Sequence, residues 1–179
     1  MKNSKSIKIQ GSKEMLAIQW EFDSYHEPYY YGYFCLWINN CKVGNFEEIS
    51  TLSIIKNYLT DFLKNEGSRI YIGSPEMSKD ELFHRLYWGF FDGSFSSPTS
   101  FNQLGEFRDI YWLDEVGEYS FRDKIGMILV DEPELGRQRL IWRELKSGIL
   151  NEFFLPGLFF DKTGREFLNA FNREIQQLP

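Results

Sequence analysis

The stretch MLAIQWEFDSYHEPYYYGYFCLWINNCKVG, residues 15–44, decides the fold class. Within Met15–Asp23, large apolar side chains alternate with small or polar ones, a period of two that is typical of a half-buried strand. A second run, Tyr30–Ile38, ends at Asn39-Asn40, and asparagine tolerates the positive φ that a tight hairpin turn requires. We therefore predict antiparallel strands over these two runs and over Cys41–Gly44.

The same hairpin predicts the state of the two cysteines. With a two-residue Asn-Asn loop, Cys41 lies opposite Ile38 and shares its face, whereas Cys35 points to the other face. A Cys35–Cys41 disulfide is therefore not expected, which agrees with a reducing compartment. Two cysteines and two histidines offer no spacing typical of a zinc site, and we expect neither a metal nor another cofactor.

Helical patterns follow the hairpin. We expect Ser50 to open a helix that ends at Gly67, and Ser78 to open a second helix with Glu81 in the capping-box position. The composition of the stretch Asp92–Gly105 is typical of a long loop.

The second half of the chain predicts further strands and a closing helix. Strand-like segments occur at Phe107–Leu113, Ile125–Asp131 and Gln138–Leu145, and an amphipathic helix runs from about Thr163 to Gln177. Strands joined by short turns and interrupted by helices indicate an α+β fold, with a mostly antiparallel sheet and helices packed on one face. We expect a single domain over residues 15–179, preceded by a lysine-bearing N-terminal extension, residues 1–14.

Composition narrows the class of protein. The chain has 179 residues, 42% of them hydrophobic and 26% charged, which excludes a disordered chain, a collagen or a coiled coil. Its start lacks the apolar stretch of a signal peptide, and its apolar runs fall far short of the ~20 residues that span a bilayer. We expect a cytoplasmic protein without a membrane partner. The net charge of −6 argues against nucleic acid and favours a basic protein as partner.

The acidic charge is concentrated in one segment. Between Glu106 and Glu134 there are nine acidic residues against three basic ones, so this segment alone carries a net charge equal to that of the whole chain. One interpretation is a solvated rim of loops and edge strands. The other is an electrostatic platform for a basic partner, because charge complementarity raises association rate and specificity. The acidic residues that we select as candidates for partner binding are Asp114, Glu115, Glu118, Glu132 and Glu134.

A tyrosine-rich segment is the second candidate surface. Five tyrosines fall within Tyr25–Tyr33, and tyrosine is favoured at interfaces because an apolar ring carries a polar tip. The alternative is that Tyr31 and Tyr33 only cover one face of a strand. For the interface hypothesis we select Tyr29 and Tyr30 as the anchors.

Signals for catalysis are weak. The sequence Asp161-Lys162-Thr163-Gly164 resembles the aspartyl-phosphate signature of cation pumps, but Arg165 replaces their threonine and their membrane helices are missing. We expect instead that Asp161 or Thr163 caps the C-terminal helix. An enzyme alternative remains, a small hydrolase that uses His26 or His84 with a carboxylate.

Three stretches together resemble one known family. They are GYFCLWINNCKVGNFEEISTL (32–52), YWLDEVGEYSFRDKIGMILVDEPELGRQRLIW (111–142) and FFLPGLFFDKTGREFLNAF (153–171). Their order is similar to that of the immunity protein 42 family, over roughly Met15 to Phe171. The resemblance implies a cytoplasmic antidote that binds the toxic C-terminal domain of a cognate effector in bacterial contact-dependent competition.

The family brings no catalytic residues, so the resemblance implies an inhibitor rather than an enzyme. The acidic segment favours a basic, nuclease-type toxin as the partner, since clustered carboxylates can mimic phosphates. We expect a monomer or a weak homodimer. A protein-binding module unrelated to toxins is the remaining alternative, and the roles of the N-terminal extension and of Ser94–Ser100 stay open.

Overall fold

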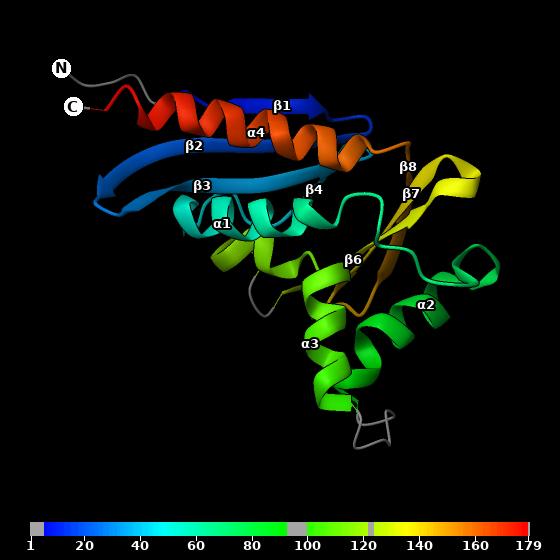
Figure 1. Ribbon diagram of the computed structural model, residues 1–179. Helices are drawn as coiled ribbons and strands as arrows, with labels where there is room; N and C mark the ends of the chain where they lie inside the picture. Colours follow the sequence, from blue (N-terminus) through cyan, green and yellow to red (C-terminus); the bar gives the residue numbers. More distant parts are fainter. Residues whose placement is uncertain (1–5, 93–99, 122–123, 179) are drawn as a thin grey trace.

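The computed structural model describes residues 6–92, 100–121 and 124–178, and it shows an α+β fold with two antiparallel sheets (Figure 1). In the first sheet the order is β1-β2-β3-β4, and β5 also pairs with β3. The second sheet has the order β6-β7-β8. The strands are β1 (Lys8–Ser12), β2 (Leu16–His26), β3 (Tyr29–Ile38), β4 (Cys41–Val43), β5 (Ile49–Thr51), β6 (Ile125–Glu132), β7 (Arg137–Glu144) and β8 (Leu150–Pro156).

The predicted hairpin is confirmed in its register. Asn39 and Asn40 take positive φ angles of 49° and 62°, and Ile38 pairs with Cys41 across the turn. Both thiols are free, with Cys35 buried and Cys41 exposed. The first sheet thus starts from the local turn chemistry that the sequence predicts.

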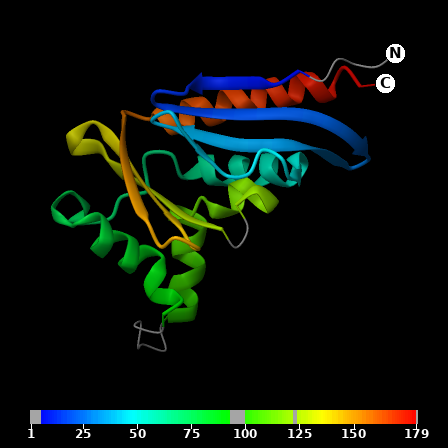
Figure 2. The same cartoon turned by 180° about the vertical axis from the view of Figure 1, so that it is seen from behind.

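Two helices cover one face of the first sheet. They are α1 (Leu52–Phe62) and α4 (Phe159–Ile175), and both lie in front of the strands in Figure 1. The ring of Trp20 on β2 meets Phe167 and Phe171 of α4 edge-on, with centroids 5.6 and 5.8 Å apart. In the opposite view α4 lies behind the strands (Figure 2), so the helices occupy one side of this sheet only.

The second sheet separates two apolar cores. Met127, Leu129 and Leu140 face the core that it shares with the first sheet, α1 and α4. On its other face Ile128 and Ile141 pack against α2 (Lys79–Leu86) and the end of α3 (Ser100–Tyr111). Because both faces are covered, every residue of β6 is buried, which explains its unbroken apolar run.

Short 3-10 helices connect these elements. They are η1 (Leu63–Asn65), η2 (Ser74–Glu76), η3 (Trp88–Phe90), η4 (Asp114–Ser120) and η5 (Pro133–Leu135). The predicted cap of α2 is confirmed, because the Ser78 hydroxyl accepts a hydrogen bond from the Glu81 backbone N–H at 3.2 Å.

Between residues 100 and 113 the prediction is wrong. The end of the expected loop and the expected strand Phe107–Leu113 together form α3, after which Trp112 makes a single bridge to Ile128. The physical reason is that Phe107, Ile110 and Tyr111 repeat at helical spacing and bury one face against the second core. Residues 93–99 of the expected loop lie outside the described residues.

Other parts of the chain also differ from the prediction. Lys8–Ser12, assigned above to the N-terminal extension, form β1 and pair along β2. Ser50 lies inside β5, and α1 begins two residues later. Leu150–Pro156 form β8, a strand that the sequence analysis did not predict, because its apolar residues alternate only in part.

A buried ion-pair network joins the two halves of the fold. The Arg69 guanidinium is fully buried and donates to both Asp161 oxygens at 2.8 and 2.7 Å, and to Asp131 at 3.2 and 3.3 Å. Gln138 donates to both of these carboxylates and accepts the Phe160 backbone N–H at 2.9 Å. The loop after η1, the adjacent strands β6 and β7, and the first turn of α4 are thereby held together.

This network corrects the expected role of Asp161. Asp161 and Thr163 both lie inside α4, whose N-cap residue is Leu158, and neither caps the helix. The carboxylate instead neutralises Arg69, a residue 92 positions away in the chain. A local sequence pattern could not reveal a partner at that distance.

We predict that Arg69→Met lowers the free energy of unfolding by about 3–5 kcal/mol, because it leaves two buried carboxylates without their cation. The matched control is Arg85→Met on α2, where the ion pair with Glu81 spans 3.0 Å and both side chains are about half exposed. This exposed pair contributes at most about 0.5 kcal/mol. Urea unfolding followed by circular dichroism measures both variants, and equal losses would contradict the structural role of the network.

The free thiols are predicted to differ in reactivity. Burial raises the pKa of Cys35 to about 11, so its thiolate is scarce as well as inaccessible at neutral pH. We expect Ellman's reagent to titrate Cys41 alone in the native protein and both cysteines after unfolding. Titration of no thiol in the unfolded, unreduced protein would instead reveal a disulfide.

Candidate functional site

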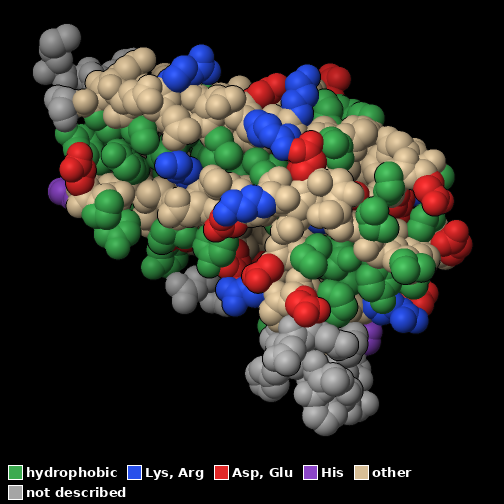
Figure 3. Space-filling model, viewed as in Figure 1, with side chains coloured by type: hydrophobic (Ala, Val, Ile, Leu, Met, Phe, Trp, Pro, Cys, Tyr) green, Lys and Arg blue, Asp and Glu red, His purple; other side chains and the backbone are tan. Residues whose placement is uncertain are grey.

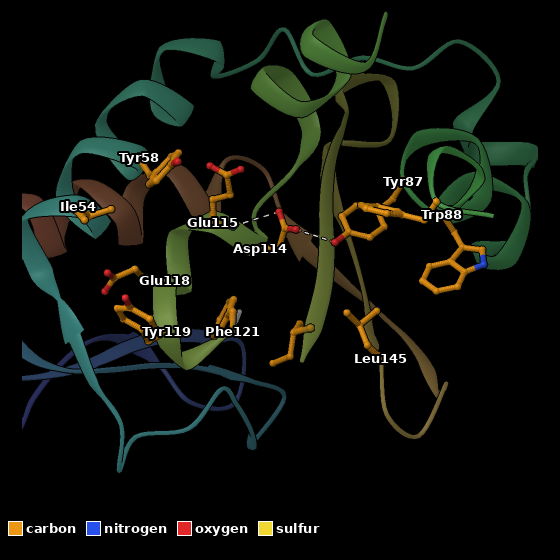
Figure 4. A pocket seen from close by; sticks show the side chains of 12 residues that line it. Ile54, Tyr58, Tyr87, Trp88, Asp114, Glu115, Glu118, Tyr119, Phe121 and Leu145 are labelled. Atoms are coloured by element: carbon orange, nitrogen blue, oxygen red, sulfur yellow. Dashed lines mark hydrogen bonds between the residues drawn. The ribbon is translucent and has the colours of Figure 1, made fainter. Parts of the chain in front are cut away.

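Three of the five selected acidic residues line one cleft. Asp114, Glu115 and Glu118 from η4 face α1 on one side and the chain after α2 on the other (Figure 4). The cleft has a volume of about 750 Å³, which lies within the range of ligand-binding pockets. Its other lining residues are mostly apolar or aromatic: Ile54, Tyr58, Tyr87, Trp88, Phe91, Tyr119, Phe121, Ile125 and Leu145.

Asp114 is the carboxylate that contacts Tyr87. It is half-buried, and burial raises its pKa to about 6, although the hydrogen bond from the Tyr87 hydroxyl (2.7 Å) acts in the opposite direction. Its charge therefore changes just below neutral pH, and a cation that enters the cleft would favour the charged form.

Tyr87 is held rigidly in this position. Its ring lies against Gly126 on β6, where any Cβ atom would come within 2.6 Å of Tyr87 Cε1. Phe83 stacks on the ring at 5.0 Å between centroids, and Trp112 packs against it at 4.5 Å. The hydroxyl that donates to Asp114 is thus oriented by packing before any ligand binds.

The other two carboxylates also have partners within the chain. Glu115 forms an ion pair with Arg108 of α3. Glu118 accepts a hydrogen bond from the backbone N–H of Thr51, the N-cap residue of α1, and takes the sparsely populated backbone conformation φ 44°, ψ −125°. The cleft therefore presents oriented acceptors beside aromatic faces, an arrangement that can bind a guanidinium or ammonium group.

A smaller cleft adjoins the first. It has a volume of about 380 Å³, shares Tyr58 and Glu115 with the larger one, and includes Asp61 and Asp109 among its lining residues. In the space-filling view acidic side chains gather where α1 approaches α3, with basic side chains between them (Figure 3). Acidic groups thus continue beyond the larger cleft, interrupted by Arg108 and Lys64.

The remaining selected acids lie away from this cleft. Glu132 is buried and forms ion pairs with Arg137 (2.6 Å) and Arg139 (3.8 Å), so its carboxylate is held inside the protein. Glu134 is exposed on η5, at the opposite end of β6 from η4. The expectation that all five acids form one platform does not match this arrangement.

The selected tyrosines lie at the β2–β3 hairpin. Tyr29 is 49% exposed, whereas Tyr30 packs edge-on against Phe171 of α4 at 5.9 Å and stacks with Tyr25. Only Tyr29 is thus available as a large exposed anchor. Neither tyrosine is among the residues that line the two clefts.

The two histidines lie on different elements. His84 on α2 has Nε2 3.1 Å from the Asp92 carboxylate, a pairing of the kind that orients a general base. His26 is exposed at the end of β2, with its ring edge-on to Tyr31 at 6.4 Å. In the described ranges no group of three or more His, Cys, Asp or Glu side chains could hold a metal ion. Every helix there is too short or too polar to cross a bilayer.

Sequence reasoning missed the aromatic walls of the cleft. Tyr58 and Tyr119 are 41% and 49% exposed, and Trp88 and Phe91 come from a third segment. In the sequence, Tyr119 indicated an aromatic wall, because it is an aromatic residue within the acidic segment. The apposition of the three segments depends on tertiary packing and leaves no local pattern.

Comparison with known proteins gives two matches. The family model described as immunity protein 42 matches residues 9–170. A crystal structure described as CdiI from Burkholderia dolosa AUO158 aligns with a TM-score of 0.60 at 17% sequence identity, over 91% of this chain and 99% of that chain. At this identity the structural match shows a shared fold. A search of curated proteins finds no match.

We predict that Asp114→Asn stabilises the protein at pH 7.5. A raised pKa means that folded Asp114 keeps a proton between about pH 4 and 6 that the unfolded chain has lost, so its contribution to stability falls as the pH rises through that range. Removal of the buried charge should add about 1–3 kcal/mol to the free energy of unfolding at pH 7.5 and almost nothing at pH 4.

Urea unfolding at the two pH values measures this difference. The control is Asp109→Asn, an exposed carboxylate on α3, which should change stability by less than about 0.5 kcal/mol at either pH. An Asp114→Asn effect that is independent of pH would refute the assignment.

Proposed function

This chain belongs to the immunity protein 42 family, and we propose that it neutralises the toxic C-terminal domain of a cognate bacterial effector by binding it stoichiometrically. The family match covers most of the chain and confirms the resemblance found in the sequence. The proposal makes the protein an inhibitor whose specificity resides in a surface.

The observation that carries the proposal is the acidic cleft formed by Asp114, Glu115 and Glu118. It is concave and is walled by aromatic rings, and its carboxylates are oriented by contacts within the chain. A lysine or arginine of the toxin would gain charge-assisted hydrogen bonds from the carboxylates and a cation–π contact with a ring such as Tyr58 or Trp88. Charge pairs that become desolvated at such an interface can couple by ~1.5–7 kcal/mol.

The Arg108–Glu115 ion pair suggests how a toxin cation enters. The Arg108 side chain is about half exposed, and an ion pair of this kind contributes only about 0–1 kcal/mol. Exchange of Arg108 for a basic side chain of the toxin therefore costs little. In the free protein, Arg108 occupies one of the positions that we assign to the toxin.

We propose a nuclease as the toxin class, because nucleases bind phosphates through clustered basic residues that the three carboxylates can engage instead. The net charge of −6 would also steer such a basic domain toward this protein. Tyr29, exposed at the β2–β3 hairpin, remains a candidate for a separate contact, and the same holds for Glu134 on η5.

Where the gene immediately upstream encodes a large secreted protein, the test uses the C-terminal domain of that protein as the toxin. Asp114→Asn with Glu115→Gln removes two cleft charges while keeping side-chain size, and it should slow association at least about tenfold and reduce its salt dependence. Biolayer interferometry at several salt concentrations measures both effects. The matched control is Glu134→Gln, which removes an exposed charge outside the cleft and should leave the rate within about twofold.

Three outcomes would contradict the assignment. Unchanged binding by the cleft variant, together with a loss in Glu134→Gln or Tyr29→Ala, would move the docking surface to another face. Failure of the wild-type protein to bind this toxin domain would refute the inhibitor function. Hydrolysis of a generic phosphodiester that is lost in His84→Ala would favour the enzyme alternative instead.

A further inference from the structure

The first sheet has an outer face that none of the described helices covers. Residues Trp20 and Phe34 point to α1 and α4, so the residues that alternate with them point the other way. Figure 2 views the sheet from this side, with α4 behind the strands. The central outer-face residues of β2 and β3 are Ala17, Gln19, Glu21, Tyr33, Cys35 and Trp37.

This outer face carries exposed apolar side chains. Ile9 on β1 and Ile49 on β5, which flank the central strands, are 45% and 50% exposed. Tyr33 and Trp37 lie on β3 two residues to either side of Cys35; both rings are half-buried, and Cys35 is fully buried. Along a strand with one exposed face, the residues on that face are normally polar and alternate with apolar residues on the buried face. A contiguous apolar patch on an exposed face marks an interaction site.

The patch is also held in place. The Trp37 indole N–H donates to Gln19 at 2.7 Å, and the Lys13 ammonium lies 3.8 Å from the centre of the Trp37 ring. The ring is thus fixed in orientation before any partner arrives, which lowers the entropy cost of association.

The charges on this face are separated by sign along the strands. Lys13 and Lys42 lie at the Trp37 end, because Lys42 pairs with Trp37 across β3 and β4. Glu21 pairs with Tyr33, four residues and roughly 13 Å further along the sheet. The level of Gln19 and Cys35 lies midway between the two ends.

Such a face is complementary to itself. Consider a two-fold axis that lies between two facing copies, runs perpendicular to the strands and passes the level of the Gln19–Cys35 pair. This axis would bring the lysine end of one copy over the glutamate end of the other. The same operation places Trp37 of each copy opposite Tyr33 of the other. Two sheets packed in this way form a sandwich with the usual separation of about 10 Å.

We propose that this outer face is the interface of a homodimer, in which the first sheets of two copies pack face to face. A basic toxin fits the acidic cleft, whereas the outer face carries both signs of charge and fits a second copy of this chain. The cleft is lined by η4, α1 and the chain after α2, with α1 on the inner side of the sheet, so dimerisation leaves it open. The proposal does not depend on the toxin-binding function.

The experiment is sedimentation velocity of the purified protein from micromolar to submillimolar concentration. The wild-type mass should approach twice the 21.3 kDa of the chain as concentration rises. Lys13→Glu with Lys42→Glu should raise the dissociation midpoint, the protein concentration at which half of the dimer dissociates, at least about tenfold. Each reversal acts twice, because the interface is two-fold symmetric. Glu21→Lys should do the same.

The decisive sample mixes these two variants in equal amounts. Opposite charges then meet only between unlike chains, so the mixture should regain the dimer mass that each variant alone has lost. The control is Lys162→Glu, an exposed reversal on α4, which should leave the wild-type midpoint unchanged.

Three results would overturn the proposal: a wild-type protein that stays monomeric throughout, reversal variants that dimerise as the wild type does, or a mixture that stays monomeric. A monomeric wild type whose Lys13 and Lys42 variants lose toxin binding would assign this face to the toxin. Failure of toxin binding with an intact dimer would refute the proposed function alone.

Discussion

The buried guanidinium of Arg69 is the constraint on which the rest of the structure depends. A single cation, fully removed from solvent, serves one carboxylate from β6 and another from α4. Any displacement of α4 from the second sheet would leave a buried charge without its partner, at a cost of several kcal/mol. Because α4 also carries the phenylalanines that pack on Trp20, the network fixes the first sheet relative to the second.

Two features of the candidate site lower the stability of the folded protein. Asp114 is partly buried at a raised pKa, and Glu118 adopts a backbone conformation that residues other than glycine rarely take. Both features make the folded state less favourable in the ionised protein, and the packed cores on either side of the second sheet offset them. A binding surface of oriented charges in a low-dielectric cleft is expected to have such a cost.

How much could be predicted from the sequence depends on the range of the interaction. The Asn39-Asn40 hairpin and the Ser78 cap were predictable, because each is determined by residues within a few positions. The role of Asp161 was not, since its partner is 92 positions away. The acids of η4 could be selected as a cluster in the chain, but the aromatic walls opposite them come from other segments. Glu132 was selected as a surface acid, but it pairs with Arg137 directly across the β6–β7 turn. Deriving the register of these two strands from the sequence would have placed the two residues opposite each other.

Strand β6 of the second sheet, buried on both faces, has a consequence for how the protein can diversify. Alternate residues of β6 face the two cores, so packing constrains nearly every position of this strand. The cleft, in contrast, is lined mainly by a 3-10 helix, the exposed side of a helix and a connecting segment. The exposed lining residues, such as Tyr58 and Tyr119, can be exchanged without repacking the second sheet. The architecture thus separates a tightly packed support from the candidate recognition surface, so the proposed binding surface could change by a few substitutions while the fold is kept.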